Sequence, residues 1–484
     1  MGEEKSTLGI TVKKNENFSD WYTQVVLKSG LADYAPVKGC MIFLPYGYAI
    51  WNNIRKVFTE MIEDEVDEVY FPIFIPKSIL EKEAEHFEGF TPEVAWVTKG
   101  GKKDLDEWLA VRPTSETIMY SYFPKIIKSW RDLPLRIIQW VNVVRWETKA
   151  TRLFFRSREF LWHEGHTCHA TKEEADEEVI KRLKQYKKLL EEYLSIPVID
   201  GYKSEGEKFR GALYTTTVEA MMPDGKALQS GTSHNLGQNF SKVFGIKFMD
   251  RDETHKYVWQ TSWGLSTRVI GAMVAIHGDD NGLVIPPRIA PIQVIIIPIY
   301  YKEEHKKMIT NKVKEIEKKL KENGIRAKSD TREEYTPGFK FNEWELKGIP
   351  LRIEVGPKDI EKSQVTIKRR DRTEKIAIKE VELLTRVHEL LEDIQKSLYE
   401  KAKKFMESRI IRIDNYEKMK ELADKGYFIE ANHCGDVECE KAIDDETGLT
   451  IRVITFENSE PFGDKKCVRC GKPAKFKAYF AKSY

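Results

Sequence analysis

The stretch from Val143 to Thr167 constrains the fold most, because it mixes charges and apolar residues in a way that few structures accommodate. It reads VVRWETKATRLFFRSREFLWHEGHT and holds four arginines and three glutamates among valine, phenylalanine, leucine and tryptophan. A solvated face does not need so many aromatic residues, and a core excludes charges that lack partners. The pattern therefore predicts a pocket that holds something charged and flat.

We expect two antiparallel strands here, VVRWE and REFLWHEGHT, joined by the polar segment TKATRLFFRS. Arginine forks bind phosphate or carboxylate oxygens in pairs, and Phe160 can stack on a flat ring. The alternative is a salt-bridged sheet edge without a ligand. A zinc-protease site is not expected, because His163 and His166 lie three residues apart on a strand rather than four apart on a helix.

The pattern of apolar, charged, Gly and Pro residues changes along the 484 residues and indicates about three domains, as the length also suggests. Apolar residues recur at helical spacing from Ile50 to Ile62, and a β-rich segment with Pro72 follows. A charged amphipathic helix is expected over residues 173–194. After the linker-like segment NGLVIPPRIAP, strands and helices alternate as in a compact α/β domain that ends in a long helix from about Ile378. The expected domains are 1–285, 286–405 and 406–484.

Composition narrows the class of protein. Lys+Arg 79 against Asp+Glu 77 leaves a net charge of +2, which argues against a basic coat for nucleic acid but allows a local basic patch. No apolar run approaches the roughly 18 residues of a membrane-spanning helix, and the N-terminus carries no signal-peptide pattern. We expect a soluble, cytoplasmic protein.

Two close cysteine pairs lie near the C-terminus, within a segment that is too small to build a large core. Their spacing, C-x4-C and C-x2-C, fits one tetrahedral Zn²⁺ held by four thiolates with a structural role. The alternative is four thiols without a metal, in a segment that would struggle to fold unaided. The predicted metal ligands are Cys434, Cys439, Cys467 and Cys470.

The segment WGLSTRVIGAMVAIHGD places Arg268 just before an apolar helix. A helix N-terminus attracts anions, so an arginine there adds a fixed cation at a site that already favours phosphate or carboxylate. On its own, a capped core helix is the alternative.

Taken together and in order, these segments resemble the three signature motifs of class II aminoacyl-tRNA synthetases. A helix is followed by a segment with Pro72. An Arg-x-Glu strand, Arg145 and Glu147, then leads through a loop to Arg156-xxx-Phe160, and the last motif contains Arg268. Each match is weak alone, but their order over more than 200 residues is a strong signal.

Four further segments, RPTSE, RSREF, QSGTSHNLGQNFSKVFG and GIPLRIEVGPKD, resemble the prolyl-tRNA synthetase family of the archaeal and eukaryotic type. No large insertion separates RSREF from QSGTSHNLG, where the bacterial type carries an editing domain. The resemblance implies an α+β protein: an antiparallel-sheet catalytic domain, an α/β anticodon-binding domain and a small zinc-binding C-terminal domain. It also implies a homodimer, with the helix before Pro72 at the interface.

The implied reaction is the ATP-dependent activation of L-proline to prolyl-adenylate, followed by transfer to the terminal adenosine of tRNA(Pro). ATP, Mg²⁺ and a structural Zn²⁺ are the implied cofactors. Such a reaction needs arginines and Mg²⁺ to neutralise two anions while aligning them, and it needs no protein nucleophile. Glu219 is a weaker candidate for a magnesium ligand.

The resemblance also assigns roles to individual residues. Arg145 and Arg268 are the expected catalytic residues. The implied proline-binding residues are Thr114, Glu116, Arg145, Trp162, Glu164, His166 and His234. The implied ATP-binding residues are Arg145, Glu147, Arg156, Ser157, Phe160, Gln229, Thr232, Ser266 and Arg268. The implied anticodon-binding residues are Glu345, Arg352, Lys358, Arg369 and Arg370.

Two other interpretations make different demands on the sequence. A class II synthetase for another small amino acid, such as threonine, would carry Cys and His zinc ligands in the catalytic domain, and that pattern is not found. A synthetase-like RNA-binding protein without catalysis would be favoured by loss of Arg145, Glu116 or Arg268, and all three are present.

Overall fold

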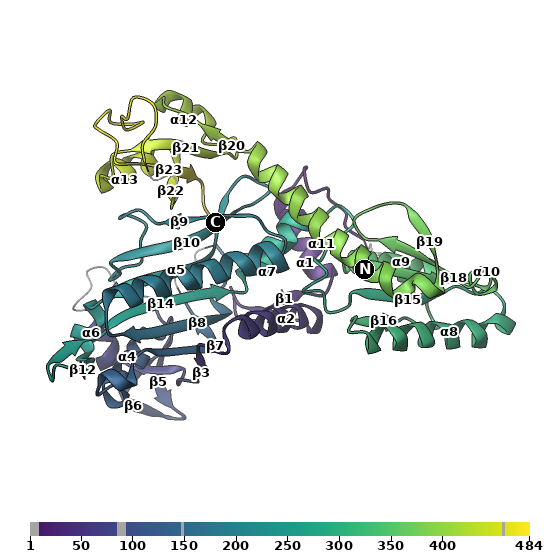
Figure 1. Cartoon of the computed structure of the whole chain (residues 1–484), viewed down its shortest axis with the longest axis horizontal. Coiled ribbons are helices and arrows are strands. Elements are labelled where there is room, and N and C mark those ends of the chain that lie inside the picture. Colours follow the sequence, from purple (N-terminus) through teal and green to yellow (C-terminus); the bar gives the residue numbers. More distant parts are fainter. Residues whose placement is uncertain (1–8, 85–92, 147–149, 457–459) are drawn as a thin grey trace.

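The computed structural model describes the backbone of residues 9–84, 93–146, 150–456 and 460–484. An eleven-stranded sheet forms the centre of this described part, in the order β20-β21-β23-β22-β9-β10-β11-β14-β8-β7-β3 (Figure 1). Its neighbouring strands are antiparallel except for β20–β21 and β3–β7. The strands from the first 285 residues are β3 (Asp67–Glu68), β7 (Leu135–Val144), β8 (Glu159–His169), β9 (Val198–Tyr202), β10 (Tyr214–Met221), β11 (Ala227–Gly237) and β14 (Trp259–Ser266).

The charged amphipathic helix expected over residues 173–194 is confirmed. It comprises α5 (Lys172–Lys188) and a π-helical turn, Leu189–Tyr193, and lies across the central sheet (Figure 1). The helix begins at a capping box, in which the Thr171 hydroxyl and the Glu174 carboxylate each accept from the other residue's backbone N–H. Its apolar face joins the main core, together with α1 (Phe18–Lys28), α2 (Pro45–Ile62) and α7 (Arg268–His277).

The β-rich segment after α2 forms two short strands in different sheets. β3 extends the central sheet beside β7, whereas β4 (Phe74–Pro76) pairs with β6 (Lys103–Val111) in a three-stranded sheet. Pro72 lies between them and belongs to neither. A proline-bearing strand does follow the helix, but it carries Pro76. The remaining elements here are β1 (Ala32–Tyr34), β2 (Met41–Phe43), α3 (Lys77–Ala84), β5 (Trp96–Gly100), α4 (Glu116–Ile126), the 3-10 turn Trp130–Asp132, α6 (Asn239–Phe244), β12 (Lys247–Met249) and β13 (His255–Tyr257).

The middle region has its own five-stranded sheet, in the order β16-β15-β17-β18-β19, and its own apolar core. The long helix α11 (Leu383–Ser408) begins five residues later than expected from the sequence. Ile376 and Ile378 belong to β19 (Lys375–Lys379), where they pair with Ile367 and Val365 at the alternating spacing of a strand. The other elements are β15 (Val294–Pro298), α8 (Glu303–Glu322), β16 (Ala327–Ser329), α9 (Pro337–Leu346), β17 (Leu351–Val355), α10 (Pro357–Glu361), β18 (Gln364–Arg369) and the 3-10 turn Glu380–Glu382.

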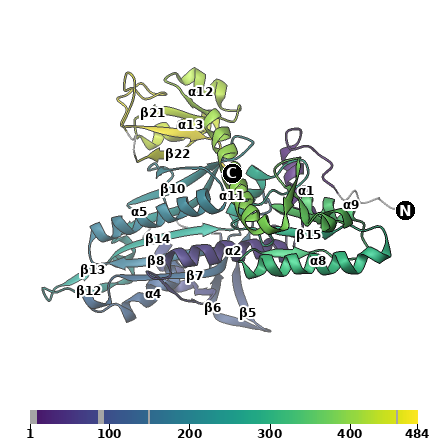
Figure 2. The same ribbon diagram turned by 45° about the vertical axis from the view of Figure 1, so that its right-hand side comes forward.

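The C-terminal region continues the central sheet. Figure 2 shows α11 leading from the middle region towards this C-terminal part. β22 (Thr450–Thr455) pairs with β9 through Ile454–Tyr202 and Thr455–Gly201. Gly201 permits the contact, since a Cβ atom there would lie 2.1 Å from the Ile454 carbonyl oxygen. The other elements are β20 (Ile410–Arg412), α12 (Tyr416–Leu422), β21 (Phe428–His433), α13 (Val437–Thr447) and β23 (Phe476–Ala481).

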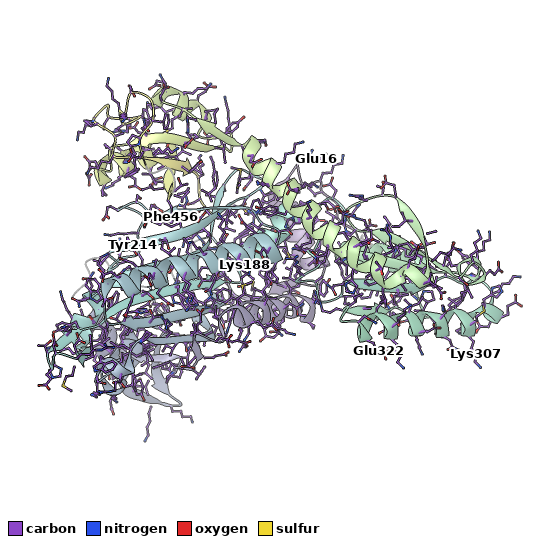
Figure 3. All side chains as sticks on the ribbon, in the orientation of Figure 1. Glu16, Lys188, Tyr214, Lys307, Glu322 and Phe456 are labelled. Carbon is purple, nitrogen blue, oxygen red and sulfur yellow. The ribbon has the colours of Figure 1, made fainter. Side chains whose placement is uncertain are left out.

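Aromatic side chains seal the junction between β22 and β9. Tyr202 packs edge-on against both Tyr214 and Phe456, with ring centroids 5.6 and 4.8 Å apart; the latter two are labelled in Figure 3. The C-terminal region is therefore packed against the strands of the first 285 residues through β22, while α11 links it to the middle region. Among the described helices, none combines the length and the apolar character that crossing a bilayer requires.

Candidate active site

A cavity of about 300 Å³ lies over β8, β11 and β14. Residues far apart in the sequence reach it because the strands pair in register: His166 lies opposite Ser262, Glu164 opposite Gly264 and Trp162 opposite Ser266. Most of the ligand-binding residues expected for proline and ATP line it. These are Thr114, Glu116, Arg145, Phe160, Trp162, Glu164, His166, Gln229, Thr232, His234, Ser266 and Arg268.

Three expected residues are not among those that line the cavity. Arg156 is exposed on the loop after β7, and Ser157 is buried with its hydroxyl donating to the Glu159 carbonyl at 2.7 Å. Glu147 lies outside the described residues.

One end of the cavity is acidic. The Thr114 hydroxyl donates to the Glu116 carboxylate, and the Ser115 hydroxyl donates to Glu164. The His166 Nε2 atom lies 3.1 Å from Glu164 and its Nδ1 atom 2.9 Å from the Tyr120 hydroxyl. Burial opposes charging of His166, but the Glu164 hydrogen bond and the nearby Glu116 carboxylate hold its pKa above the ordinary value. This end therefore gathers two carboxyl groups around a histidine whose pKa they raise, and it favours a cation.

Glu164, at the acidic end, stays ionised although it is buried from solvent. Burial raises its pKa, but hydrogen bonds from His166, Ser115 and Gln139 outweigh this and leave the pKa below its usual value. Its two oxygens accept four hydrogen bonds, including one from the Ser115 backbone N–H at 3.2 Å. A carboxylate held in this way remains charged when buried.

The other end of the cavity is cationic. The Arg145 Nε atom donates to the Pro113 carbonyl at 3.1 Å, and its guanidinium lies 5.4 and 5.5 Å from the ring centres of Phe160 and Trp162. Arg268 is the first residue of α7 and donates to the Phe155 carbonyl at 3.2 Å. Burial, together with the charges of Arg145 and Arg156, lowers the pKa of Arg268 to about 10. Mutually repelling guanidinium groups at a helix N-terminus favour a bound polyanion.

The structure adds cavity residues that the sequence did not single out. The Phe209 ring lies 4.8 Å from the His234 ring, and the Thr215 hydroxyl lies 2.9 Å from His234 Nδ1. Burial lowers the pKa of His234 to about 3, with a smaller effect from His166, so His234 is neutral. Two-residue alternation along β14, starting from Ser266, would have pointed to Ser262 and Gly264. Phe209 lies in a loop, and no periodic pattern marks it. The added residues are Glu207, Phe209, Thr215, Ser230, Gly231, Ser262, Trp263, Gly264 and Leu265.

Glu219 does not line the cavity. It is fully buried between Lys203, at 2.7 Å, and Arg452 from β22, at 3.3 Å. Two cations already occupy its oxygens, and this arrangement does not support the weaker expectation that Glu219 binds magnesium. It instead forms a buried charge cluster between β10 and the C-terminal region.

Tyr484 meets the loop between β7 and β8. Its ring stacks on Phe155 at 4.5 Å, and its hydroxyl donates to Asp224 at 2.6 Å. Since the Phe155 carbonyl accepts from Arg268, the last residue of the chain packs behind the cationic end without lining the cavity.

The candidate anticodon residues occupy different environments. Glu345 and Arg352 line one hollow on the middle region, and the Arg352 guanidinium lies 4.0 Å from the Phe341 ring centre. Arg369 and Arg370 reach the same hollow. All three arginines are held by carboxylates: Glu354 for Arg352, Asp371 and Asp393 for Arg369, and Asp279 for Arg370. Lys358 lies apart from this hollow on α10.

The four cysteines converge, as their spacing predicts. The Sγ atoms of Cys439 and Cys467 lie 3.8 Å apart, and those of Cys434 and Cys470 lie 3.6 Å apart. A tetrahedral Zn²⁺ with Zn–S bonds of about 2.3 Å would give S···S edges of about 3.8 Å, so the residues fit this metal. His433 is an additional neighbour: one of its ring nitrogens lies within 4.8 Å of the Sγ atoms of Cys434, Cys439 and Cys467. Its Nδ1 atom already accepts from the Gly435 N–H at 3.0 Å.

Models of known families match three successive parts of the chain. The class II tRNA synthetase core domain (G, H, P, S and T) matches residues 96–277, and the anticodon binding domain matches residues 293–390. The C-terminal domain of prolyl-tRNA synthetase matches residues 416–484. The proline–tRNA ligase of Natranaerobius thermophilus is 50% identical over 475 residues, 97% of each chain. The chain belongs to the prolyl-tRNA synthetase family.

Other members of the prolyl-tRNA synthetase family are about as similar. A proline–tRNA ligase 2 of Bacillus cereus is 50% identical over 482 residues, 99% of this chain and 100% of that one. The crystal structure of prolyl-tRNA synthetase from Cryptosporidium parvum, complexed with halofuginone and AMPPNP, superimposes with a TM-score of 0.94 at 48% identity. It covers 99% of this chain and 100% of that chain. Bacterial relatives at this level mean that similarity does not confine the chain to the archaeal and eukaryotic type.

Proposed function

We propose that this chain activates L-proline with ATP and transfers it to the terminal adenosine of tRNA(Pro). The observation that carries the proposal is a single cavity with an acidic end at Glu116 and a cationic end at Arg145 and Arg268. Proline presents one cation and one carboxylate, and ATP adds phosphate anions. The two ends of the cavity match this order of charges, and membership of the family supports the assignment.

The acidic end is proposed to bind the amino acid. Glu116 and Thr114 accept the two N–H groups of the proline ammonium, while Trp162 and His234 enclose the ring. Glu164 is hydrogen-bonded to His166 beneath this site, and Glu116 is the carboxylate that meets the ammonium.

The cationic end is proposed to bind ATP. Arg145 lies between the two substrates and bridges the proline carboxylate and the α-phosphate. Arg268 and Phe160 enclose the adenine, and Arg156 from the neighbouring loop contacts the phosphates. The remaining proposed ATP contacts are Glu147, Ser157, Gln229, Thr232 and Ser266.

In the first step, a proline carboxylate oxygen attacks the α-phosphorus of ATP. The new O–P bond forms as the bond to the β-phosphate oxygen breaks, and pyrophosphate leaves. Arg145 and Arg268 stabilise the charge that develops on the phosphate, and no protein nucleophile takes part. Mg²⁺, which accompanies the nucleotide, would further screen its phosphates. In the second step, a ribose hydroxyl of the terminal adenosine attacks the prolyl carbonyl and AMP leaves.

Recognition of tRNA is proposed to involve the hollow on the middle region. Glu345 can accept from guanine N–H donors, and Arg352 and Lys358 can donate to base acceptors. Arg369 and Arg370 remain candidates, and like Arg352 they have carboxylate partners within the protein.

The C-terminal cysteines are proposed to hold one structural Zn²⁺ through four thiolates. The two short Sγ–Sγ distances and the burial of Cys434, Cys439 and Cys467 in their own cluster support this set. His433 is the competing fourth ligand. Its Nδ1 atom accepts from the Gly435 N–H, which places the ring proton on the unpartnered Nε2 atom and leaves neither nitrogen free for a metal, so Cys470 is favoured.

We further propose domain boundaries at 1–285, 286–405 and 406–484, the type without an inserted editing domain, and a cytoplasmic homodimer. The matches to the Natranaerobius thermophilus and Cryptosporidium parvum proteins cover nearly the whole of each chain. They support the absence of an insertion relative to these two proteins. The short edge strand β3 and the neighbouring exposed rings of Tyr70 and Phe74 offer a surface for a second copy.

The proposal is tested by aminoacylation. Purified protein should attach labelled proline to an unmodified tRNA(Pro) transcript in an ATP-dependent reaction. A transcript with altered anticodon guanines should be charged more slowly, while pyrophosphate exchange with proline stays the same. Failure to charge any tRNA(Pro), despite normal exchange, would limit the chain to amino-acid activation.

A further inference from the structure

Gln139 on β7 lies at the centre of a hydrogen-bond network beneath the acidic end of the cavity. It is fully buried and faces Glu164 in the β7–β8 register. Its Nε2 atom donates to Glu164 Oε1 and to the Ser115 hydroxyl, both at 2.8 Å. Its Oε1 atom accepts from the Phe71 backbone N–H at 2.9 Å. Gln139 does not line the cavity.

Chemistry fixes the orientation of this amide. The Phe71 N–H can only donate, so the atom facing it must be the oxygen. The two amide hydrogens are then aimed at an ionised carboxylate and at a hydroxyl that itself donates to the same carboxylate. No rotated amide satisfies all three neighbours, and the side chain has one stable arrangement.

The three partners of Gln139 belong to three separate segments. Phe71 precedes Pro72, Ser115 lies between Thr114 and Glu116, and Glu164 lies on β8. The Phe71 carbonyl is also held, by the buried Arg112 at 2.8 Å. Gln139 thus joins the segment after β3 to residues 114–116, a loop that ends at Glu116, the first residue of α4.

We propose that Gln139 is a positioning residue for the amino acid: its amide holds the 114–116 loop against Glu164 and so fixes Thr114 and Glu116 where they meet the substrate ammonium. This inference rests on the proposed function. The Gln139 side chain makes no hydrogen bond to Arg145, Arg268 or any other described residue at the cationic end. Its effect should therefore fall on proline rather than on ATP.

The test compares Michaelis constants for the two substrates in ATP–pyrophosphate exchange. Gln139→Leu removes the three hydrogen bonds, and Gln139→Glu keeps the shape but replaces the donor with a second carboxylate. Each should raise the KM for proline about tenfold or more, the usual effect of losing a hydrogen bond to a buried charge. The KM for ATP should stay within about twofold, and kcat should change much less than the proline KM.

Gln260 provides a matched control. It is equally buried, lies on β14 of the same sheet opposite Cys168, and makes no hydrogen bond to the 114–116 loop. Gln260→Leu should leave both Michaelis constants unchanged. An equal response of Gln260→Leu and Gln139→Leu would show a general effect of removing a buried amide.

The outcomes separate this inference from the proposed function. If the unaltered protein activates no proline, the proposed function fails. If it does, and both folded Gln139 variants keep the original proline KM, the inference is overturned. Equal rises in the KM for proline and for ATP, or loss of folding in both variants, would also overturn it, because Gln139 would then support the fold alone.

Discussion

Arg370 and Asp279 form a two-point ion pair between the middle region and the catalytic region. The Nη1 and Nη2 atoms of Arg370 lie 2.7 and 2.5 Å from the two carboxylate oxygens of Asp279. The Nε atom of Arg370 donates to the Glu345 carbonyl at 2.9 Å. Asp279 follows α7, whose first residue is Arg268. The pair therefore connects a candidate anticodon residue to the helix that forms part of the cationic end.

This pair should contribute to stability. Arg370→Ala and Asp279→Ala should each lower the melting temperature, and a double-mutant cycle should give a coupling of about 1–2 kcal/mol, since Arg370 is buried and Asp279 is partly exposed. Arg372→Ala is the control: it removes an exposed arginine that meets Asp393 at 3.3 Å, and it should have little effect. If the stability losses of the two single variants simply add in the double variant, the ion pair does not stabilise the contact between the two regions. Unchanged stability with impaired tRNA binding would return Arg370 to the anticodon-binding set.

Arg352→Ala should weaken aminoacylation but spare activation. Arg352 stacks on Phe341 and pairs with Glu354 at the hollow, away from the cavity. Losing one base contact costs roughly 1–3 kcal/mol. The KM for tRNA(Pro) should therefore rise about fivefold or more, with pyrophosphate exchange unaltered. The exposed Lys307 on α8, labelled in Figure 3, offers a control substitution to alanine. An equal fall in charging and exchange would make Arg352 a structural residue.

The purified protein should contain about one zinc per chain. Cys470→Ser should lose most of the metal, whereas His433→Gln and the distant Cys40→Ser should retain it, because four thiolates complete the tetrahedron. Metal analysis of the three variants, alongside melting curves, checks this. Retention of zinc by Cys470→Ser together with its loss in His433→Gln would assign the fourth ligand to histidine.

Arg145→Ala should abolish most adenylate formation while leaving the fold intact. Removing one electrostatic contact at the reacting anions usually costs about 10²–10³ in rate. Arg158→Ala is the control, since Arg158 belongs to the same stretch of sequence but donates to the Lys38 carbonyl and does not line the cavity. Near-normal exchange by a folded Arg145→Ala protein would refute its central role.

Much of the cavity could be predicted from the sequence through the family resemblance, and Trp162, Glu164 and His166 then lie on one face because side chains alternate along β8. An antiparallel pair of strands was expected here, but the first strand, β7, ends at Val144 and so precedes Arg145, while the resemblance also supplied the residues on β11 and α7. Thr215 was missed because its role depends on lying opposite His234 across two strands. The spacing of residues along the chain does not predict which residue lies opposite on the neighbouring strand.

The residues whose interpretation changed are those with partners in another region. Glu219 looked available for a metal until Arg452, more than 200 positions later, was seen beside it. Arg370 looked like a free cation for a base until Asp279 was seen to hold it. Composition and motif spacing describe which charges a chain carries, but the neutralisation of a charge depends on the tertiary fold.

The most direct test of the account is ATP–pyrophosphate exchange with each of the twenty amino acids. Proline should give the highest kcat/KM, because its secondary ammonium has two N–H donors that Thr114 and Glu116 can both satisfy. A primary ammonium leaves one donor unpaired, at a cost on the order of 1–3 kcal/mol. Alanine and cysteine fit the same space and should be the best of the wrong substrates. A preference for threonine or serine, or no exchange with any amino acid, would contradict the account.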